Sequence, residues 1–501
     1  MADTRRVRKR GGWAFAAIAA SVLALYGPAL AYGFVYDDRW TITRNQGLGA
    51  PLSRILRALL DGHGARLGLA DKTRPAMVLS MWIDRRVFGL SPIGFHAHSV
   101  LLYVLTCTTA WMALRVLLGR PRPALLGAFF FLAAPLHAEV VACVNYREDL
   151  IAAVNGLVVI AIFFAPRRFR EPRPRAHEIA VLAAAMVLAL GAKESALCLP
   201  VLIAATAWVR KDGLAFMRAR SAFVTAMLVT TVVFLNWRIS IPDDVPRGPD
   251  TGLVLRILAT LRYEVWAVFG AFVPFFWSPE RAAPAAPSAV WLLPFAAVVA
   301  LVLWLRRSVD GRPFAMALVF ALVAPLASCP LLRPANELAD RYLFLGVLGG
   351  AMAFGVAVDR ALERGSALHL AGAATATIFL VGAAAVTVQA RSVFRSDADL
   401  WQAAVDRAPD SPRAWSALSH TRRVQGRLTD ADDAAAHALA LDPTYAPARL
   451  TRVYNMLARG DVLEARAELS AFDDADAPPG LALARECASL PPSLAEACIA
   501  R

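Results

Sequence analysis

Long apolar stretches fill most of the first 390 residues, and short arginine-rich loops separate them. Because a helix needs about 20 apolar residues to cross the hydrocarbon core of a bilayer, these stretches predict transmembrane helices. The first is longer than the apolar part of a typical signal peptide, so we expect it to remain as a span. The stretches lie near residues 12–32, 95–117, 124–144, 150–165, 179–208, 221–240, 253–277, 289–305, 313–332, 342–358 and 368–389.

Two of these stretches contain charged residues in their interior. A single helix over 179–208 would be about 45 Å long and would put basic loops on both sides of the membrane. We therefore predict two short spans that turn at Lys193-Glu194, below the membrane surface. The same argument predicts a re-entrant or interfacial hairpin at 253–277, and the expected total is about 11 spans.

The orientation follows from the loops, since cytoplasmic loops of membrane proteins carry an excess of Lys and Arg. With the basic loops inside, the N-terminus is cytoplasmic, the C-terminus lies outside, and the expected location is the inner (cytoplasmic) membrane. The basic clusters are residues 5–10, Arg115/Arg120/Arg122, 167–175, 210–220, Arg306/Arg307/Arg312 and Arg360/Arg364.

The composition supports a membrane protein with a polar tail. The chain is 58% hydrophobic and only 18% charged, which excludes a single water-soluble enzyme. The net charge is +14, yet residues 397–501 hold 16 acidic and 11 basic side chains. We therefore predict a membrane domain over 1–395 and an extracytoplasmic domain over 396–501. We attribute the excess of arginine over lysine to GC-rich codon usage, and we infer no nucleic-acid binding from it.

Polar residues recur at the outer ends of the predicted spans. Ionisable groups near membrane depth are costly unless they are paired or hydrated, so we predict a polar cavity in the outer leaflet. The alternative is a set of unrelated helix-end anchors and solvated loop charges. These residues are Asp37, Asp38, Arg74, His96, His98, His137, Glu139, Arg147, Glu148, Asp149, Lys193, Glu194, Arg238, Glu337, Asp340 and Arg341.

The first outer loop, residues 33–94, is far longer than the others. Within it, residues 51–60 form an amphipathic pattern with Leu52, Ile55, Leu56 and Leu59 on one face. Such a helix would lie in the membrane interface, and residues 75–88 are a second candidate for a surface-lying helix.

The tail contains an internal repeat with a spacing of 34 residues. Small residues at helix contacts, Gly at the turn and Pro at the end are typical of tetratricopeptide repeats. We therefore predict a short tetratricopeptide α-solenoid, which either caps the membrane domain or offers a groove to a protein or peptide. The matching pairs are Pro409/Pro443, Ala414/Ala448, Gly426/Gly460, Asp430/Glu464 and Ala431/Ala465.

The cysteines divide in the same way as the chain. Four lie in or beside predicted spans and are expected to be buried thiols. Cys487 and Cys498 lie in the tail, where an oxidising compartment would allow a disulfide. The sequence contains no Walker loop, dinucleotide fingerprint, nucleophile elbow or zinc spacing.

Six motifs and the tail together resemble one family, the transmembrane and tetratricopeptide-repeat O-mannosyltransferases of the GT-C superfamily. The resemblance implies an all-α, polytopic fold, a periplasmic or lumenal active site, a polyprenyl-phosphate sugar donor and Ser/Thr acceptors. The motifs are FVYDDRWTITRN (34–45), TRP (73–75), GLSPIGFHAHSVLL (89–102), PLHAEVVACVNYREDL (135–150), AKESAL (192–197) and ELADRYLFL (337–345).

The outer residues suit such a transfer. A hydroxyl acceptor needs a base, which Asp37 or Asp38 can provide, and the resemblance favours Asp37, the first acidic residue after the first span. Cations must bind the leaving phosphate. Whether Asp37 and the phosphate hold a divalent cation (Mg or Mn) between them is left open. We expect the donor phosphate and sugar to contact Arg74, His137, Glu139, Arg147, Asp149, Lys193, Glu194 and Arg341.

Two other functions remain open from the sequence. One is a GT-C enzyme that glycosylates a lipid or glycan acceptor. The other is a non-catalytic scaffold whose tail recruits proteins. A transporter is the weakest alternative, because the spans show no inverted repeat.

Overall fold

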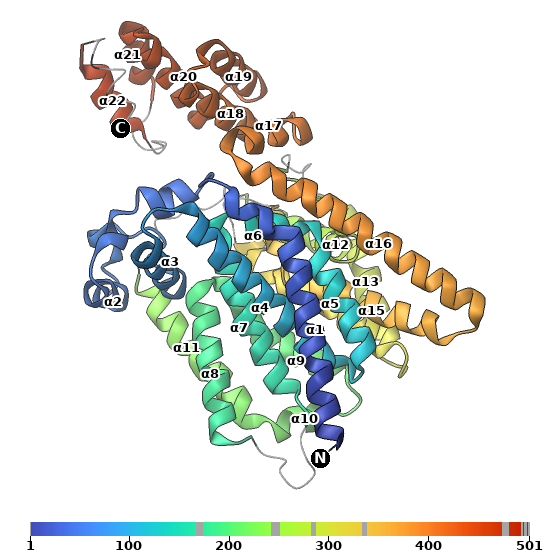
Figure 1. Cartoon of the computed structure of the whole chain (residues 1–501). Coiled ribbons are helices and arrows are strands. Elements are labelled where there is room, and N and C mark those ends of the chain that lie inside the picture. The colour runs from blue at the N-terminus through green and yellow to red at the C-terminus, as the bar shows by residue number, and fades with distance from the viewer. Residues whose placement is uncertain are drawn as a thin grey trace. The chain divides into compact units, whose positions relative to one another are not determined.

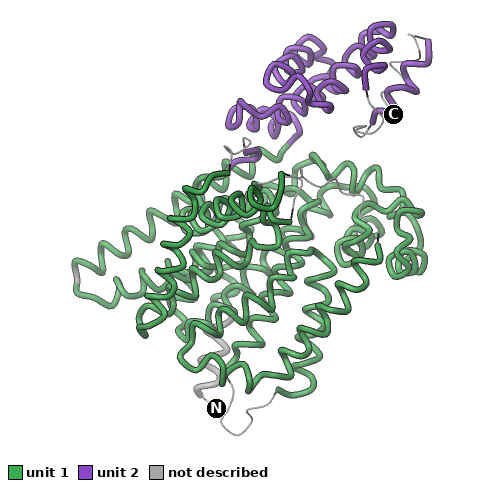
Figure 2. The backbone as a smooth tube through the Cα atoms, turned by 180° about the vertical axis from the view of Figure 1, so that it is seen from behind, with its two compact units in different colours: residues 1–277, 286–395 green, residues 278–285, 396–501 purple. Residues whose placement is uncertain are grey.

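A computed structural model describes residues 2–166, 174–241, 251–281, 287–332, 338–472, 480–491, 494 and 498. No strand occurs among these residues, which confirms the predicted all-α class. The chain divides into two compact units, shown in different colours in Figure 2. Unit 1 comprises Met1–Trp277 and Ala286–Arg395, and unit 2 comprises Ser278–Ala285 and Ser396–Arg501.

Unit 1 is a bundle of helices, drawn from blue to orange in Figure 1. Its α-helices are α1 (Ala2–Tyr26), α2 (Leu52–Leu60), α3 (Pro75–Phe88), α4 (Pro92–Leu118), α5 (Pro121–Ala133), α6 (Ala138–Ala142), α7 (Arg147–Phe164), α8 (Ala176–Ala192), α9 (Leu199–Val209), α10 (Gly213–Ala219), α11 (Ser221–Ile239), α12 (Leu253–Phe272), α13 (Leu292–Leu305), α14 (Arg312–Val323), α15 (Val347–Glu363) and α16 (Ser366–Ser392).

Close packing of α5 against α15 forms part of the buried centre of unit 1. Glycines permit it: a Cβ on Gly355 would stand 2.1 Å from the Pro123 carbonyl oxygen, and one on Gly127 would stand 2.6 Å from that of Ala351. Small residues that let two backbones approach are typical of helix contacts inside membranes. The centre therefore depends on residues that hydrophobicity alone does not single out.

The chain is a multi-pass membrane protein. Five helical segments are long and apolar enough to cross a bilayer, and α5 with Pro135–Ala142 makes a sixth that is bent by 54°. Three further apolar helices, Ala176–Ala192, Glu194–Val209 and Ala289–Leu305, are shorter. The count of about 11 spans stays a prediction. The five segments are Gly12–Ala31, Pro92–Leu118, Ser221–Ile239, Arg312–Leu332 and Ala367–Arg395.

The two charged stretches have different outcomes. The break predicted inside 179–208 is confirmed, because α8 ends at Ala192 and Lys193 adopts an extended backbone. The hairpin predicted for 253–277 is wrong, since α12 is one continuous helix of 20 residues. Its charged residues Arg262 and Glu264 are buried in the protein, so they do not force a turn.

The long loop after the first span contains both predicted helices, α2 and α3. The apolar residues of α2 do not share one environment, however. Ile55 and Leu59 are buried in a cluster with Met77, Met81 and Phe95. Leu52 and Leu56 are 38% and 39% exposed, so the helix offers a second apolar strip outward. An interfacial position for α2 stays a prediction.

Unit 2 consists of α17 (Asp397–Arg407), α18 (Pro412–Val424), α19 (Leu428–Leu441), α20 (Ala446–Arg459), α21 (Val462–Ser470) and α22 (Leu481–Ser489). The 34-residue repeat corresponds to two helix pairs, α18–α19 and α20–α21. Gly426 and Gly460 occupy the same turn in each pair, with φ of +76° and +86°, a conformation that favours glycine. The four repeated alanines are fully buried.

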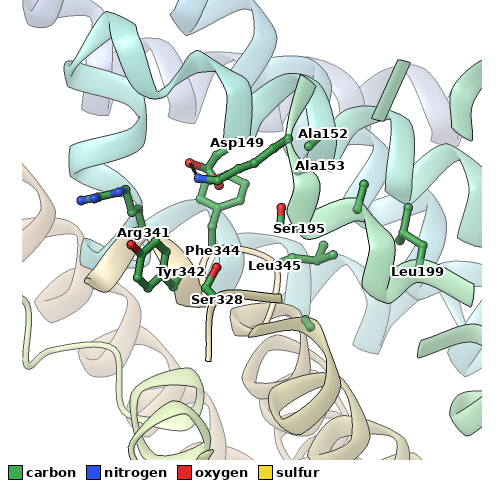
Figure 3. Close-up of a pocket in the computed structure, with 13 residues that line it drawn as sticks. Asp149, Ala152, Ala153, Ser195, Leu199, Ser328, Arg341, Tyr342, Phe344 and Leu345 are labelled. Atoms are coloured by element: carbon green, nitrogen blue, oxygen red, sulfur yellow. Dashed lines mark hydrogen bonds and ion pairs between the residues drawn. The ribbon is translucent and has the colours of Figure 1, made fainter. Parts of the chain in front are cut away.

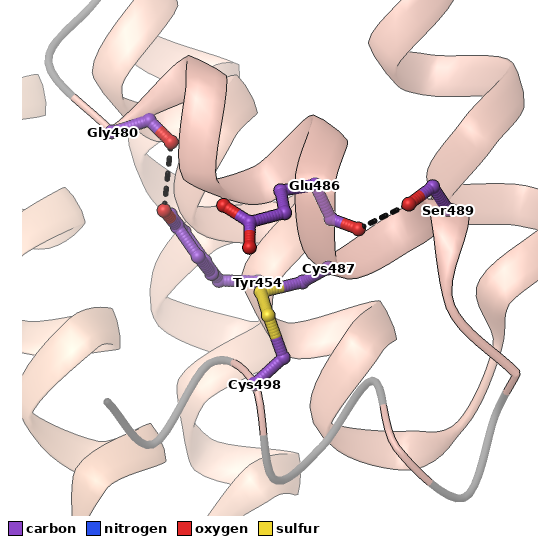
Figure 4. Close-up of a disulfide and its surroundings, with 6 residues drawn as sticks. All are labelled: Tyr454, Gly480, Glu486, Cys487, Ser489 and Cys498. Carbon is purple, nitrogen blue, oxygen red and sulfur yellow. Dashed lines mark hydrogen bonds between the residues drawn. A yellow bond between two sulfur atoms is a disulfide. The ribbon is translucent and has the colours of Figure 1, made fainter.

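Two further contacts complete unit 2. Cys487 and Cys498 form a disulfide, which confirms that prediction, and Figure 4 shows it beside Tyr454, whose hydroxyl donates to the Gly480 carbonyl at 2.8 Å. The described residues 278–281 group with unit 2, since Glu280 accepts from Arg413 at 2.5 Å and from Ser411 at 3.2 Å.

Candidate active site

Arg74 joins segments from three parts of unit 1. It directly precedes Pro75, whose fixed φ is suited to the first position of α3. Its Nη1 donates to Glu148 Oε2 at 2.5 Å and its Nε to Glu194 Oε2 at 3.2 Å. Glu148 lies in the first turn of α7, where the helix dipole favours an acidic residue. The planar guanidinium therefore bridges two carboxylates that are 46 positions apart.

Lys193 is a second cation attached to the start of α7. Its extended backbone between α8 and the 3₁₀ segment Glu194–Cys198 directs the side chain to that helix. The ammonium Nζ lies 2.5 Å from Asp149 Oδ2 and 3.1 Å from Glu148 Oε1. Lys193 is 6% exposed, so these carboxylates compensate a buried charge. Glu148 is shared between Arg74 and Lys193.

A narrow cavity of ≈ 30 Å³ adjoins this network. Its polar lining includes Asp149, Lys193, Ser195, Ser328 and Arg341. Figure 3 shows Asp149 and Arg341 at one end and Leu199 at the other. The space suffices for a water molecule, and its walls combine cations with aliphatic side chains. The structure thus brings Lys193, Asp149 and Arg341, predicted from distant motifs, to one place.

Arg341 connects the cavity to the loop after the first span. Its Nη1 donates to Glu139 Oε1 at 2.7 Å, and its guanidinium carbon lies 4.5 Å from the centre of the Tyr146 ring. The Tyr146 hydroxyl in turn lies 3.5 Å from Asp37 Oδ2. Burial raises the pKa of Tyr146, so its hydroxyl keeps the proton that it directs to the carboxylate. Asp37 is therefore linked to Arg341 through one aromatic side chain.

Asp38 has a different environment from Asp37. It is fully buried, and its Oδ1 accepts from the Asn145 backbone N–H at 2.6 Å and from the Cys143 thiol at 3.4 Å. Its Oδ2 accepts from the Val35 N–H at 3.2 Å. Both carboxylate oxygens of Asp38 therefore accept hydrogen bonds from the protein, and its role in catalysis stays a prediction. Burial raises the pKa of this carboxyl to about 7.

Arg147 and His137 lie outside the network. Arg147 is fully buried and donates from Nη1 to Asp84 Oδ2 at 2.5 Å and from Nη2 to the Phe95 carbonyl at 2.7 Å. His137 contacts the Tyr103 hydroxyl at 3.0 Å and the Phe344 carbonyl at 3.2 Å. Both side chains hold helices together, and neither lines the cavity, contrary to the predicted donor contacts.

The remaining predicted residues are divided. Arg238 lies 3.6 Å from Glu194, at the edge of the network. The negative charge of Asp340 acts on the Glu139 carboxylate. His98 pairs with Asp84 at 2.7 Å, and His96 faces the Gly33 carbonyl. Glu337 lies outside the described residues.

Sequence reasoning did not single out Asp71, Asp84 or Tyr146. Asp71, in a positive-φ turn, lies 3.5 Å from Arg74. Asp71 lies two residues before the TRP motif, and Tyr146 lies within the NYREDL motif. Their positions at these motifs are the only sequence signal that could have identified them. Asp84 carries no such signal.

No group of three His, Cys, Asp or Glu side chains is placed to hold a metal ion within the described ranges. The divalent cation stays a prediction, and the steps proposed below do not use it.

Comparison with solved structures gives two partial likenesses. The ArnT of Cupriavidus metallidurans bound to undecaprenyl phosphate aligns with a TM-score of 0.45 and 17% identity, over 92% of this chain and 81% of that one. The Archaeoglobus fulgidus oligosaccharyltransferase in its apo form aligns with a TM-score of 0.43 and 11% identity, over 80% of this chain and 58% of that one. Both TM-scores are below 0.5, so neither likeness supports an argument about the site.

Comparison with known sequences is more informative. No family model matches the chain. Protein O-mannosyl-transferase Tmtc1 of Drosophila melanogaster is 34% identical over 148 residues, which are 28% of this chain and 17% of that protein. Tmtc2 of the same fly is 33% identical over 181 residues (34% and 19%), and mouse TMTC1 is 33% identical over 153 (29% and 16%).

The chain thus spans less than a fifth of the length of these relatives. The matches nevertheless confirm the resemblance that the six ordered motifs predicted. Over the matched part of its length, this chain is similar to TMTC-type protein O-mannosyl-transferases.

Proposed function

We propose that the protein is a membrane glycosyltransferase that transfers a sugar, mannose, from a polyprenyl-phosphate donor to Ser/Thr hydroxyls of extracytoplasmic proteins. The observation that carries the proposal is the pair of cations Lys193 and Arg341, which Asp149 and Glu139 hold in place beside aliphatic side chains. A polyprenyl-phosphate sugar presents the same combination of an anionic phosphate and an apolar chain. The protein O-mannosyl-transferases that match part of the chain support the choice of sugar and acceptor.

The donor phosphate is assigned to Lys193 and Arg341. Hydrogen bonds from a cation to a phosphate are stronger than those between neutral groups, and they are strongest where water is excluded. Both cations are held by carboxylates that fix their positions before the donor binds. The aliphatic wall at Ala152, Ala153 and Leu199 is assigned to the first part of the lipid chain.

Asp37 is assigned as the general base. The acceptor oxygen attacks the anomeric carbon, and the bond from that carbon to the phosphate oxygen breaks. The electron pair leaves with the polyprenyl phosphate, whose charge Lys193 and Arg341 stabilise, and the hydroxyl proton passes to the Asp37 carboxylate. Asp38 acts as a positioning residue, because it fixes the backbone of the loop that carries Asp37.

The remaining parts of the proposal concern location and acceptor binding. We assign about 11 spans, an inner-membrane location and a periplasmic active site, on the basis of the basic loops. The helix pairs of unit 2 are assigned as tetratricopeptide repeats that bind the acceptor protein, supported by the equivalent glycine turns at Gly426 and Gly460.

The test is a transfer assay with the purified full chain. It is incubated with a panel of polyprenyl-phosphate sugars, and mass spectrometry measures the mass gained by Ser/Thr peptides, lipids and glycans. We expect a hexose on the peptide, its loss in Lys193→Gln, and normal transfer in Arg218→Gln, whose exposed arginine lies on α10. A mass gain on lipid or glycan alone would assign a different acceptor. No gain in any arm would leave the scaffold function.

A further inference from the structure

A second cavity, of ≈ 330 Å³, lies away from the candidate active site. It is formed where α9 ends at Val209, where α13 ends at Leu305 and where α14 begins at Arg312. Figure 1 shows α10, which follows α9 after three residues, at the end of unit 1 opposite to α6. This cavity therefore belongs to the other end of the helix bundle from Glu139 and the Asp149 network.

The lining of this cavity is strongly cationic. Five of its seven residues are Arg210, Lys211, Arg306, Arg307 and Arg312, and none is acidic. Within the described part of the chain, an ion pair with a carboxylate occurs for Arg210 alone, which lies 3.3 Å from Asp212. Concentrating five like charges around one cavity, only one of them with a carboxylate partner among the described residues, is unfavourable unless an anion neutralises them.

Two of the cations are held in place rather than extended into solvent. The Arg306 guanidinium lies 3.5 Å from the centre of the Trp208 ring and donates to the Trp208 carbonyl at 3.2 Å. Arg312 donates to the Arg306 carbonyl at 3.4 Å. These contacts use backbone oxygens and a ring, so they fix the two side chains without neutralising their charges. The fixed geometry distinguishes the cavity from a flexible basic loop.

Apolar surface leads to the cavity along the same helices. Leu303 in its lining, Trp304 beside it and Val201 on α9 are 43%, 64% and 54% exposed. Both helices are among the apolar ones of this membrane protein. A phosphate group that enters from solvent needs no such apolar path, whereas a phospholipid uses both the cations and the helix surface.

We propose that this cavity binds the phosphate of an anionic phospholipid, with the acyl chains along α9 and α13. The five cations replace the counter-ions of the headgroup. The geometry is independent of the proposed transferase function, because none of these residues lines the first cavity.

The test uses the full chain in nanodiscs of phosphatidylcholine with a small fraction of phosphatidylglycerol. Native mass spectrometry after release into detergent counts the phosphatidylglycerol molecules retained. The variant Lys211→Gln/Arg307→Gln removes two cations of the cavity, and both side chains are exposed, so folding is preserved. The control Arg218→Gln/Arg364→Gln removes two exposed cations outside the cavity lining.

We expect the cavity variant to bind phosphatidylglycerol about 30-fold more weakly than the parent, since each cation that contacts the bound headgroup contributes about fivefold, and the two control cations lie outside the cavity. The control should retain lipid as the parent does. Equal losses in both variants would overturn the proposal and indicate general surface attraction. Full displacement of the lipid by millimolar inorganic phosphate would also overturn it, because the cavity would then take the free ion.

Discussion

Arg74 Nη1 donates to Glu148 Oε2 at 2.5 Å, and this contact fastens the start of α3 to the start of α7. The Glu148 side chain is 4% exposed. Removal of the arginine would leave a buried carboxylate with Lys193 as its remaining cation, and such losses are costly.

We therefore expect Arg74→Ala to lower the free energy of unfolding by about 3 kcal/mol. Denaturant unfolding of the purified protein in detergent, followed by tryptophan fluorescence, measures the change. The control is Arg427→Ala, which removes an exposed pair with Asp430 in unit 2 and should cost less than about 1 kcal/mol. Equal costs for the two variants would show that the Arg74 network does not stabilise unit 1.

The proposed base gives a kinetic prediction. Asp37→Asn preserves the shape of the side chain and removes its basicity, so transfer should fall about 10²- to 10⁴-fold while donor binding is retained. The transfer assay and a lipid-binding measurement, performed on the same preparation, separate these effects. A near-normal rate in this variant would reject Asp37 as the base.

Asp38 gives a pH-dependent stability prediction. Its folded-state pKa of about 7 lies above the ordinary value, because burial disfavours the charged form. The folded state therefore binds a proton that the unfolded state has lost between about pH 4 and pH 7. The contribution of this carboxyl to stability is present at low pH and is lost as the pH rises through 7.

The comparison variant is Asp38→Asn, which cannot titrate. We expect it to destabilise the protein by about 1–3 kcal/mol at pH 5, because a donor replaces one acceptor of the backbone N–H groups. At pH 8 the loss of stability of Asp38→Asn relative to the parent should be smaller. Melting temperatures of both proteins at the two pH values test this, and a disadvantage that grows with pH would contradict the assignment.

The disulfide of unit 2 gives a fourth prediction. It closes a loop with a sequence separation of 11 residues, for which chain entropy gives a stabilisation of about 3 kcal/mol. Cys487→Ser should therefore lower the stability of unit 2 and leave unit 1 unchanged. Limited proteolysis of α20–α22, with and without reductant, measures it. The parent and the variant should differ without reductant and coincide with it.

Local patterns predicted part of this structure well. Residues 75–88, named as a candidate helix, form α3, and a charged pair within an apolar stretch predicted the break at Lys193. Both features determine the backbone structure of residues that are close to them in the sequence. The 34-residue repeat likewise placed the two helix pairs of unit 2, since equivalent residues recur in equivalent turns.

Long-range packing explains the failures. The charges of α12 looked like a reason for a turn, but Arg262 and Glu264 are buried in the folded unit, where α12 packs against α13, α14 and α15. Arg147 and Lys193 looked equivalent as cations near helix ends. Only the fold shows that Arg147 meets Asp84, 63 positions away, while Lys193 lines the cavity. A sequence cannot tell which way such a side chain turns.

The sharing of Glu148 between Arg74 and Lys193 has a consequence for turnover. Lys193 already has two carboxylate partners, so an incoming phosphate must compete with them for the same ammonium. Glu148 and Asp149 therefore compete with the phosphate for the Lys193 ammonium. This competition weakens phosphate binding. In the proposed transferase, the same competition would speed the release of the leaving polyprenyl phosphate, so that the site does not retain its product between cycles.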